Sequence, residues 1–216
     1  MILAVIGAGK VGSALANGLQ KSGHQVILAH DDPNNESVNK ARQANPALGY
    51  AGLQQAIDSS DAILLAVPFP AVQALLSPLQ FRGQVLIDCT NPVGPGISHG
   101  LQSTGSGSEA IQVWAAGAQV VKAFTVYGFE NLTTLPSART PKTVMPFAGN
   151  DQKAKEVVAG LIEDLGFEAL DCGGLDRALH LEHMTLLWVK MVRQDGHSPY
   201  FTWAYLNHTK NESKAE

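Results

Sequence analysis

Three glycines near the N-terminus have the spacing that holds the diphosphate of a dinucleotide. They lie in the segment GAGKVG, residues 7–12. In such a loop the first glycine permits a tight turn, the second lets the backbone approach the diphosphate, and the third lets helix and strand pack closely. The N–H groups and the positive dipole end of the following helix face the phosphates. The residues predicted to bind the cofactor here are Gly7, Ala8, Gly9, Lys10, Val11 and Gly12.

The surroundings of these glycines decide their interpretation, because a glycine-rich turn alone is common. An apolar run predicts a strand over residues 2–6, and the pattern then predicts a helix over 10–21 and a second strand over 25–29. The second strand ends in acidic residues, as the dinucleotide-binding pattern requires. This context favours a phosphate-binding loop over an ordinary strand–helix turn.

The second strand is followed by His30, Asp31 and Asp32. A carboxylate about twenty residues beyond the glycines accepts hydrogen bonds from the adenosine ribose. It repels a 2′-phosphate by about 1 kcal/mol in water and about 4 kcal/mol at a semi-buried site, a penalty of roughly tenfold or more. Of the residues that could offset this repulsion, His30, Lys40 and Arg42 are the nearest. His30 and Asp31 are therefore predicted to bind the cofactor, and local chemistry favours NAD over NADP.

The chain alternates short apolar runs with helical patterns, which is typical of an α/β protein with a parallel sheet covered on both faces. We predict a doubly wound, mostly parallel sheet of the Rossmann type over residues 1–172 and a small helical segment over 173–216. Residues 135–141 read as a proline-containing loop, and the tail from Asn207 is polar. The predicted strands are 2–6, 25–29, 62–67, 84–88, 120–124, 143–148 and 167–171. The predicted helices are 10–21, 36–44, 71–79, 109–116, 154–165 and 175–191.

Composition restricts the class of protein. Of the 216 residues, 45% are hydrophobic and 16% charged, with a formal net charge of −4, which argues against a nucleic-acid partner. The two cysteines, Cys89 and Cys172, are far apart and indicate free thiols in a reducing cytosol. No basic segment precedes the apolar start, and the longest apolar stretch, 62–76, is interrupted by prolines. We therefore expect a cytoplasmic protein without a membrane partner.

Polar residues follow the predicted strand 84–88. Thr90, Asn91 and Pro92 stand at its carboxyl end, the edge at which open parallel sheets bind ligands. A Thr-Asn pair there could hydrogen-bond the ribose or the carboxamide of a nicotinamide nucleotide, and both are equally ordinary turn residues. All three are candidate cofactor-binding residues.

Five segments together resemble one family: VIGAGKVGSALANGL, DAILLAVPFPAV, VLIDCTNPVG, VVKAFTVYGFENL and LDCGGLDRALHLEHMTLLWVK. Their order and spacing are similar to those of the deazaflavin-dependent NADP oxidoreductases, which include enzymes that reduce the 8-hydroxy-5-deazaflavin coenzyme (coenzyme F-420) with NADPH. They also resemble the cytosolic domain of the six-transmembrane metalloreductases. The resemblance covers the chain to about residue 206. It implies hydride transfer between NADP and a deazaflavin or flavin ring, and a homodimer.

The resemblance also implies site residues. Backbone groups of Ala66, Val67 and Pro68 would line the nicotinamide ribose, and a backbone N–H at Ala123 or just after it would face the nicotinamide amide. Family members carry a Ser-Arg pair after the second strand, the arginine binding the 2′-phosphate, where this chain has His30-Asp31. Because family precedent and local chemistry disagree, NADP and NAD both stay open.

Hydride transfer between such rings needs alignment and exclusion of water more than an acid or a base. We therefore assign no catalytic acid or base in this sequence. Asp176, His180 and His183 share a helical face and could bind zinc or iron, but no fourth ligand is evident, so a solvated or interface surface is favoured over a metal site. Tyr127 is the aromatic residue expected nearest the acceptor ring, with packing as the competing role.

Two other functions remain open. An imine or hydroxy-acid dehydrogenase would need a proton donor, for which Lys190 falls late in the final helix. A dinucleotide-binding redox sensor would bind the cofactor without turnover.

Overall fold

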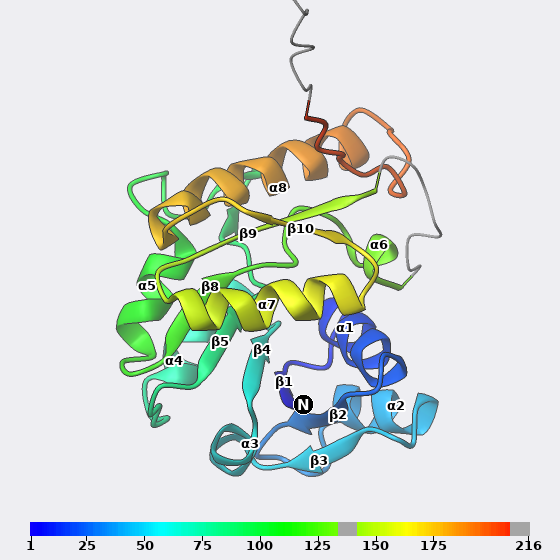
Figure 1. The fold of residues 1–216 in the computed structure, drawn as a ribbon, viewed down its shortest axis with the longest axis vertical. Helices are drawn as coiled ribbons and strands as arrows, with labels where there is room; N and C mark the ends of the chain where they lie inside the picture. The colour runs from blue at the N-terminus through cyan, green and yellow to red at the C-terminus, as the bar shows by residue number, and fades with distance from the viewer. Residues whose placement is uncertain (134–141, 208–216) are drawn as a thin grey trace, which may run out of the picture.

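An eight-stranded sheet forms the centre of the molecule in the computed structural model, which describes residues 1–133 and 142–207. Its strand order is β10-β9-β8-β5-β4-β1-β2-β3 (Figure 1). Neighbouring strands are parallel except β8 and β9, which are antiparallel. The strands are β1 (Ile2–Ile6), β2 (Gln25–Ala29), β3 (Gly49–Ala51), β4 (Ala62–Leu65), β5 (Val85–Asp88), β8 (Gln119–Lys122), β9 (Val144–Gly149) and β10 (Glu168–Asp171). A separate antiparallel pair comprises β6 (Val93–Gly94) and β7 (Ser98–His99).

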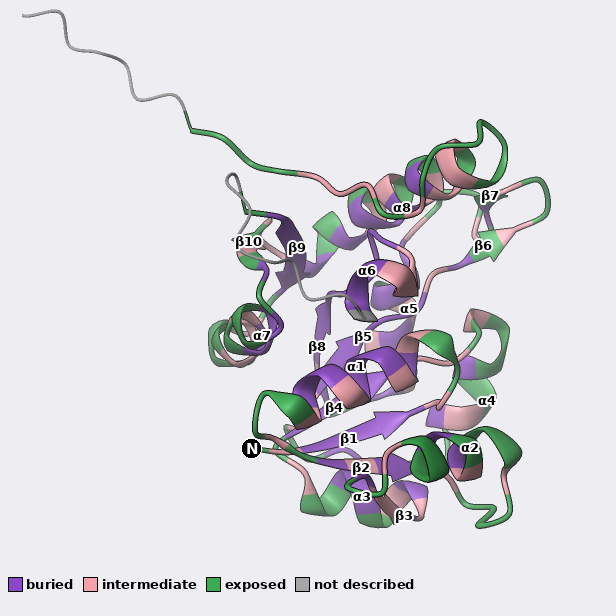
Figure 2. Ribbon diagram, turned by 90° about the vertical axis from the view of Figure 1, so that its right-hand side faces the viewer, coloured by how far each residue is buried: buried purple, intermediate pink, exposed green. Residues whose placement is uncertain are grey.

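Helices cover both faces of the sheet, and β1 shows how the core is divided. Leu3 and Val5 belong to an apolar cluster shared with α1, α2, α7 and α8, whereas Ala4 and Ile6 belong to one shared with α3, α4 and α5. Successive side chains of a strand point to opposite faces, so each face has its own core. Buried strands lie between helices with exposed outer faces (Figure 2). The helices are α1 (Lys10–Lys21), α2 (Glu36–Ala44), α3 (Leu53–Ser59), α4 (Val72–Leu76), α5 (Gly107–Trp114), α6 (Phe129–Thr133), α7 (Gln152–Asp164) and α8 (Ala178–Arg193), with 3-10 turns at Phe69–Ala71 and Leu175–Arg177.

The predicted fold class, a doubly wound and mostly parallel α/β sheet, is confirmed. The first four elements, β1, α1, β2 and α2, have the predicted bounds. The helix predicted over 71–79 is shorter, because Pro70 lies in a 3-10 turn before it and Pro78 has no backbone N–H with which to continue the helix. The strand predicted to reach residue 124 ends at Lys122, and Phe124 takes a left-handed conformation with φ of 59°.

The prediction did not contain β6, β7 or α6, nor two elements that bear on the site, β3 and α3. The strand is three residues long and pairs only with β2, so it is too short to show an alternating pattern. The helix does carry a readable signal, since its buried residues Leu53, Ala56 and Ile57 have helical spacing. These elements matter for the site, because the N-terminus of α3 lies beside the end of β2.

The C-terminal segment packs back on the sheet. The N–H of Val144 in β9 donates to the carbonyl of Trp203 at 3.1 Å, and the Asn131 side chain donates to the carbonyl of Pro199 at 2.7 Å. A division of the chain at residue 172 stays a prediction. The predicted loop 135–141 and the tail beyond residue 207 lie outside the described residues.

Two smaller predictions concern the thiols and the membrane. Cys89 and Cys172 are both free thiols, as expected. Within residues 1–133 and 142–207, no helix has the length and apolar character needed to cross a bilayer.

Candidate dinucleotide-binding site

The glycine loop connects β1 to α1, and its backbone geometry leaves no room for side chains at two positions. Gly7 has φ of +101°, and a Cβ there would lie 2.6 Å from the carbonyl oxygen of Ala66 in the neighbouring segment. A Cβ on Gly12 would lie 1.8 Å from the carbonyl oxygen of Gly7. A Cβ on Gly9 would meet no heavy atom within 4 Å. The loop is therefore closed on its protein side and open where a ligand would approach.

The N-terminus of α1 presents backbone donors at this opening. Gly9 is the N-cap, no side chain caps the helix, and its first turn has no acidic residue. The first N–H groups of a helix have no partner inside the helix, so they suit a phosphate. The Lys10 ammonium lies 5.0 Å from the centre of the Phe129 ring, which ties the first turn to α6.

A cleft of about 510 Å³ opens on the α3 and α4 side of this loop. Gly7, Asp31 and Leu53 line it, together with Val67, Pro68 and residues of α4. Its largely apolar lining and its place at the carboxyl ends of β1, β2 and β4 suit the adenine half of a dinucleotide.

Asp31 lies in this cleft, but its carboxylate has a protein partner. The Leu53 N–H at the start of α3 donates to Asp31 Oδ1 at 2.8 Å. From the sequence, this carboxylate is expected to face the adenosine ribose. The structure shows that it also holds the N-terminus of α3, which the prediction did not contain, and that contact stabilises its negative charge.

His30 is held inside the turn that follows β2. Asn35 Oδ1 accepts the N–H of Val38, so the Asn35 amide group donates to His30 Nε2 at 3.1 Å. The backbone N–H of Asp32 donates to His30 Nδ1 at 3.0 Å. Both ring nitrogens of His30 thus have partners within the turn.

The other candidate residues lie at the same edge, after β4, β5 and β8. Thr90 is directed inward, and its hydroxyl donates to Asp88 Oδ1 at 2.7 Å. The N–H of Ala123 donates to the carbonyl of Asp88 at 3.2 Å, so it continues the sheet ladder instead of facing a ligand. Asn91 and Pro92 follow Thr90 directly in the chain. After β4, Ala66 packs against the glycine loop, and Val67 and Pro68 line the cleft.

Two polar atoms at this edge are buried without a partner. Asn91 Oδ1 and the hydroxyl oxygen of Thr125 make no hydrogen bond within the described part of the chain. Asn91 follows β5 and Thr125 follows β8, and these strands are neighbours in the sheet. Buried polar atoms are nearly always hydrogen-bonded in folded proteins, so this pair indicates a place where a ligand supplies the missing partners.

Beneath these residues lies a buried charge network that sequence reasoning missed. Lys122 Nζ lies 3.0 Å from Asp88 Oδ2 and 3.3 Å from Glu182 Oε1, and it also donates to the carbonyl of Thr90. The side chains of Lys122 and Asp88 are fully buried, and that of Glu182 is 1% exposed. The signal available in the sequence was a charged residue at the end of each of two apolar strands, β5 and β8.

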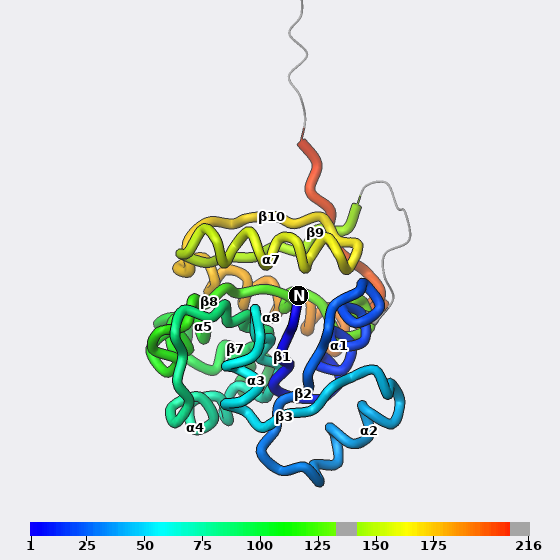
Figure 3. The backbone as a smooth tube through the Cα atoms, turned by 60° about the horizontal axis from the view of Figure 1, so that its bottom comes forward, coloured from blue at the N-terminus to red at the C-terminus, as the bar shows by residue number. Residues whose placement is uncertain are grey.

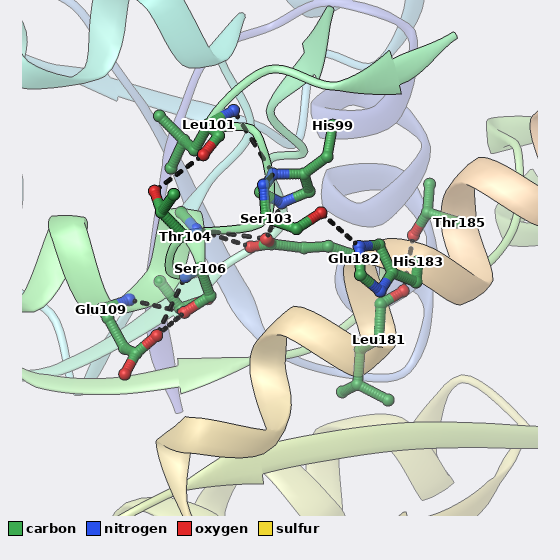
Figure 4. A network of polar contacts seen from close by, with 12 residues as sticks. His99, Leu101, Ser103, Thr104, Ser106, Glu109, Leu181, Glu182, His183 and Thr185 are labelled. Atoms are coloured by element: carbon green, nitrogen blue, oxygen red, sulfur yellow. Dashed lines mark hydrogen bonds and ion pairs between the residues drawn. The ribbon is translucent and has the colours of Figure 1, made fainter.

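The network continues to the β6–β7 pair. His99 Nδ1 accepts the N–H of Ser103 at 3.1 Å, so its Nε2 donates to Glu182 Oε2 at 2.8 Å (Figure 4). The N–H of Gly107 also donates to Glu182, at 2.9 Å. The Glu182 carboxylate of α8 thus contacts His99 of β7, the N-terminus of α5 and Lys122 at the end of β8. These contacts fix the edge of the sheet where Asn91 and Thr125 lie.

Three other side chains singled out in the sequence have structural partners. His183 Nε2 lies 2.9 Å from the hydroxyl of Ser103 (Figure 4), and Asp176 pairs with Arg177 at 3.5 Å. No group of three metal-binding side chains is assembled anywhere in the described ranges. Tyr127 is buried, its hydroxyl donates to the carbonyl of Val144 at 2.7 Å, and burial raises its pKa. It is a packing residue of the core.

Known proteins are similar to this chain over different spans. Residues 2–92 match the model of the family described as NADP oxidoreductase, coenzyme F420-dependent. The F420-dependent NADP reductase of Methanothermobacter thermautotrophicus is 29% identical, over 88% of this chain and 89% of the relative. A putative F420-dependent NADP-reductase from Arthrobacter sp. FB24 has a TM-score of 0.76 and 25% identity, over 88% of this chain and 92% of its own.

A second solved structure, the hypothetical protein SMa0349 from Sinorhizobium meliloti, shares the fold with a TM-score of 0.74 at 24% identity, covering 95% of this chain and 96% of its own. Together with the glycine loop and the sheet order, these matches show that the chain is similar to the coenzyme F420-dependent NADP oxidoreductases.

Proposed function

We propose that this chain is an NADP(H)-dependent oxidoreductase that transfers hydride between the nicotinamide ring and a deazaflavin ring. The names of its relatives, F420-dependent NADP reductase, support both partners of the reaction. The glycine loop and the 510 Å³ cleft meet at one edge of the sheet, as the two halves of a dinucleotide site require.

The observation that carries this proposal is the pair of unpartnered polar atoms on Asn91 and Thr125. A nicotinamide carboxamide has two N–H donors and one acceptor, which fit an amide oxygen and a hydroxyl that follow two neighbouring strands. We assign these two side chains to that group. The diphosphate binds the first turn of α1, and the adenine lies in the cleft beside α4.

A bound nicotinamide supplies the hydride chemistry, and the protein orients the ring and excludes water. The Asp88–Lys122–Glu182 network fixes the backbone that carries Asn91, because Lys122 donates to the carbonyl of Thr90. Glu182 joins α8 to the same network, so α8 is fixed to the edge that carries Asn91. We assign the C-terminal segment from residue 173 to the acceptor side of the site.

The same segment is the proposed interface of a homodimer. Leu187 on α8 and Tyr200 after it are 52% and 62% exposed, which is high for large apolar side chains. Sedimentation equilibrium tests whether the chain forms this dimer. A monomer at micromolar concentration would contradict it. We place the protein in the cytoplasm.

The test of the function is the initial rate of NADPH oxidation with 8-hydroxy-5-deazaflavin as acceptor, with NADH and FMN as the alternative donor and acceptor. We expect turnover with the deazaflavin and a higher kcat/KM for NADPH than for NADH. Saturable dinucleotide binding without reduction of either ring would favour a redox sensor and contradict the proposal.

A further inference from the structure

The backbone on both sides of Asn91 is held by distant parts of the chain. The buried ammonium of Lys122 donates to the carbonyl of the residue before Asn91. The N–H of Gly100 donates to the carbonyl of the residue after it, at 2.6 Å. Gly100 begins a loop, residues 100–105, that leads from β7 into α5, on the side of the molecule away from α2 (Figure 3). The placement of Asn91 therefore depends on the shape of this loop.

The 100–105 loop has a conformation that its residues rarely adopt. Gln102 and Ser103 have φ of 53° and 58°, in the left-handed region, and neither is a glycine. Such residues cost conformational energy, persist only where the surrounding structure holds them, and concentrate at functional sites. Both side chains are exposed, so they do not anchor the loop by burial. The backbone of the loop needs another anchor.

That anchor is the imidazole of His99, the last residue of β7. Its Nδ1 accepts the N–H of Leu101 at 3.3 Å and the N–H of Ser103 at 3.1 Å. Because Nδ1 accepts, Nε2 carries the proton and donates to Glu182 Oε2 at 2.8 Å (Figure 4). The His99 side chain is only 3% exposed. One buried ring thus connects the loop on one side of Asn91 to the charge network on the other.

We propose that His99 is a positioning residue for hydride transfer. It holds the 100–105 loop in its left-handed conformation, and the loop holds the backbone beside Asn91, whose side-chain oxygen we assign to the nicotinamide carboxamide. The inference rests on the proposed function, since it concerns the alignment of the same ring. His99 acts through the loop, so its replacement should misalign the ring without removing a contact to the dinucleotide.

Two substitutions of His99 separate hydrogen bonding from volume. The side-chain oxygen of asparagine is as many bonds from Cβ as Nδ1 of histidine, so His99→Asn keeps the acceptor for the loop. The side-chain nitrogen of glutamine corresponds to Nε2, so His99→Gln keeps the donor to Glu182 and loses that acceptor. Glutamine is the closer to histidine in volume. A residue that merely filled space would tolerate His99→Gln better, whereas the positioning role requires the reverse.

The full-length chain is assayed for NADPH oxidation with 8-hydroxy-5-deazaflavin, and fluorescence titration gives the dissociation constant and the emission of bound NADPH. His99→Gln should lower kcat about tenfold, as expected for a lost orienting contact, and change the NADPH dissociation constant less than about twofold, because the diphosphate end is intact. Its emission should shift, since emission depends on the surroundings of the nicotinamide ring. His99→Asn should keep kcat within about threefold of wild type and leave the emission unchanged.

His24 is the matched control. Its Nε2 also lies 2.9 Å from a carboxylate, that of Asp164, but it precedes β2, at the end of the sheet opposite to Asn91. His24→Gln and His24→Asn should leave kcat and the emission of bound NADPH unchanged. Urea unfolding shows that each variant is folded before it is assayed.

A measurement on the wild-type chain covers the case in which His99→Gln does not fold. Nitrogen-15 NMR of the histidine-labelled protein reports which ring nitrogen carries a proton. We expect His99 to carry its proton on Nε2 and to accept hydrogen bonds at Nδ1. A proton on Nδ1 would overturn the inference, because the ring could not then hold the loop.

Failure of this inference differs from failure of the proposed function. An unchanged kcat in His99→Gln, or a loss in His99→Asn that equals or exceeds it, would overturn the positioning role while hydride transfer stands. If the wild-type chain binds NADPH and reduces no deazaflavin, the proposed function fails and the emission of bound NADPH decides: equal emission in wild type and His99→Gln overturns the positioning role. Absence of NADPH binding would overturn both.

Discussion

The two ends of the proposed dinucleotide site are built in different ways. The diphosphate end uses backbone N–H groups of one continuous segment, from β1 through α1. The nicotinamide end uses side chains from segments far apart in the chain: Asp88 and Lys122 are 34 residues apart, and His99 and Glu182 are 83 apart. The first end depends on local backbone shape, whereas the second depends on the correct assembly of four separate elements. Substitutions on the open side of the glycine loop should therefore affect binding alone, whereas substitutions in the buried charge network at the second end should lower stability.

The largest effect is expected at the nicotinamide end, from Lys122→Met. Removing the ammonium leaves Asp88 and Glu182 buried without their cation, which should lower the free energy of unfolding by about 3–5 kcal/mol. Urea unfolding monitored by circular dichroism measures this loss. Lys155→Met is the matched control, because its pair with Asp171 is at the surface and should contribute less than about 1 kcal/mol. Similar losses in both variants would contradict the role given to the network.

Two alanine substitutions separate shape from binding at the diphosphate end. Gly9→Ala meets no neighbouring atom in the protein and should leave the melting temperature unchanged while weakening NADPH at least tenfold, since its methyl group occupies the approach of the diphosphate. In Gly12→Ala the added methyl group clashes with the carbonyl of Gly7, so this substitution should lower the melting temperature and also weaken NADPH binding. A Gly9→Ala variant that binds NADPH normally would show that the diphosphate lies elsewhere.

Asn91→Ala tests whether the nicotinamide end holds the ring. The side-chain oxygen has no partner in the described protein, so its removal should change the free energy of unfolding by less than about 1 kcal/mol. The same substitution should lower kcat about tenfold or more, because the ring loses an orienting contact. Steady-state rates and urea unfolding of the same preparation give the comparison. A loss of stability with unchanged kcat would make Asn91 a structural residue.

The smallest effect is expected from Asp31→Asn. Because the carboxylate already binds the N-terminus of α3, its neutralisation should change the ratio of NADPH to NADH affinity by less than about threefold. Fluorescence titration with both nucleotides measures this ratio. A shift of tenfold or more toward NADPH would return Asp31 to the ribose-binding role that the sequence predicts.

The sequence was informative where function follows from local spacing. The glycines, the strand before them and the helix after them could be placed from residues 1–29, because periodicity and turn chemistry act within a few residues. The edge position of Asn91 was also predictable, since the carboxyl ends of parallel strands share one edge of the sheet. Asp31 was placed correctly at the end of β2, but its partner on α3 was not, because neither β3 nor α3 had been predicted.

The sequence by itself thus determined the fold class, the phosphate-binding loop and the edge at which the ligand binds. Only the tertiary structure decided which charges face one another. Lys122 and Glu182 are unremarkable in their own segments, and they become a network because β8 and α8 meet below the same edge. Lys40 and Lys10 line one cavity for the same kind of reason, since α1 and α2 both border it. Electrostatic interactions depend on distance in space and on burial, and neither quantity is contained in the spacing of residues along the chain.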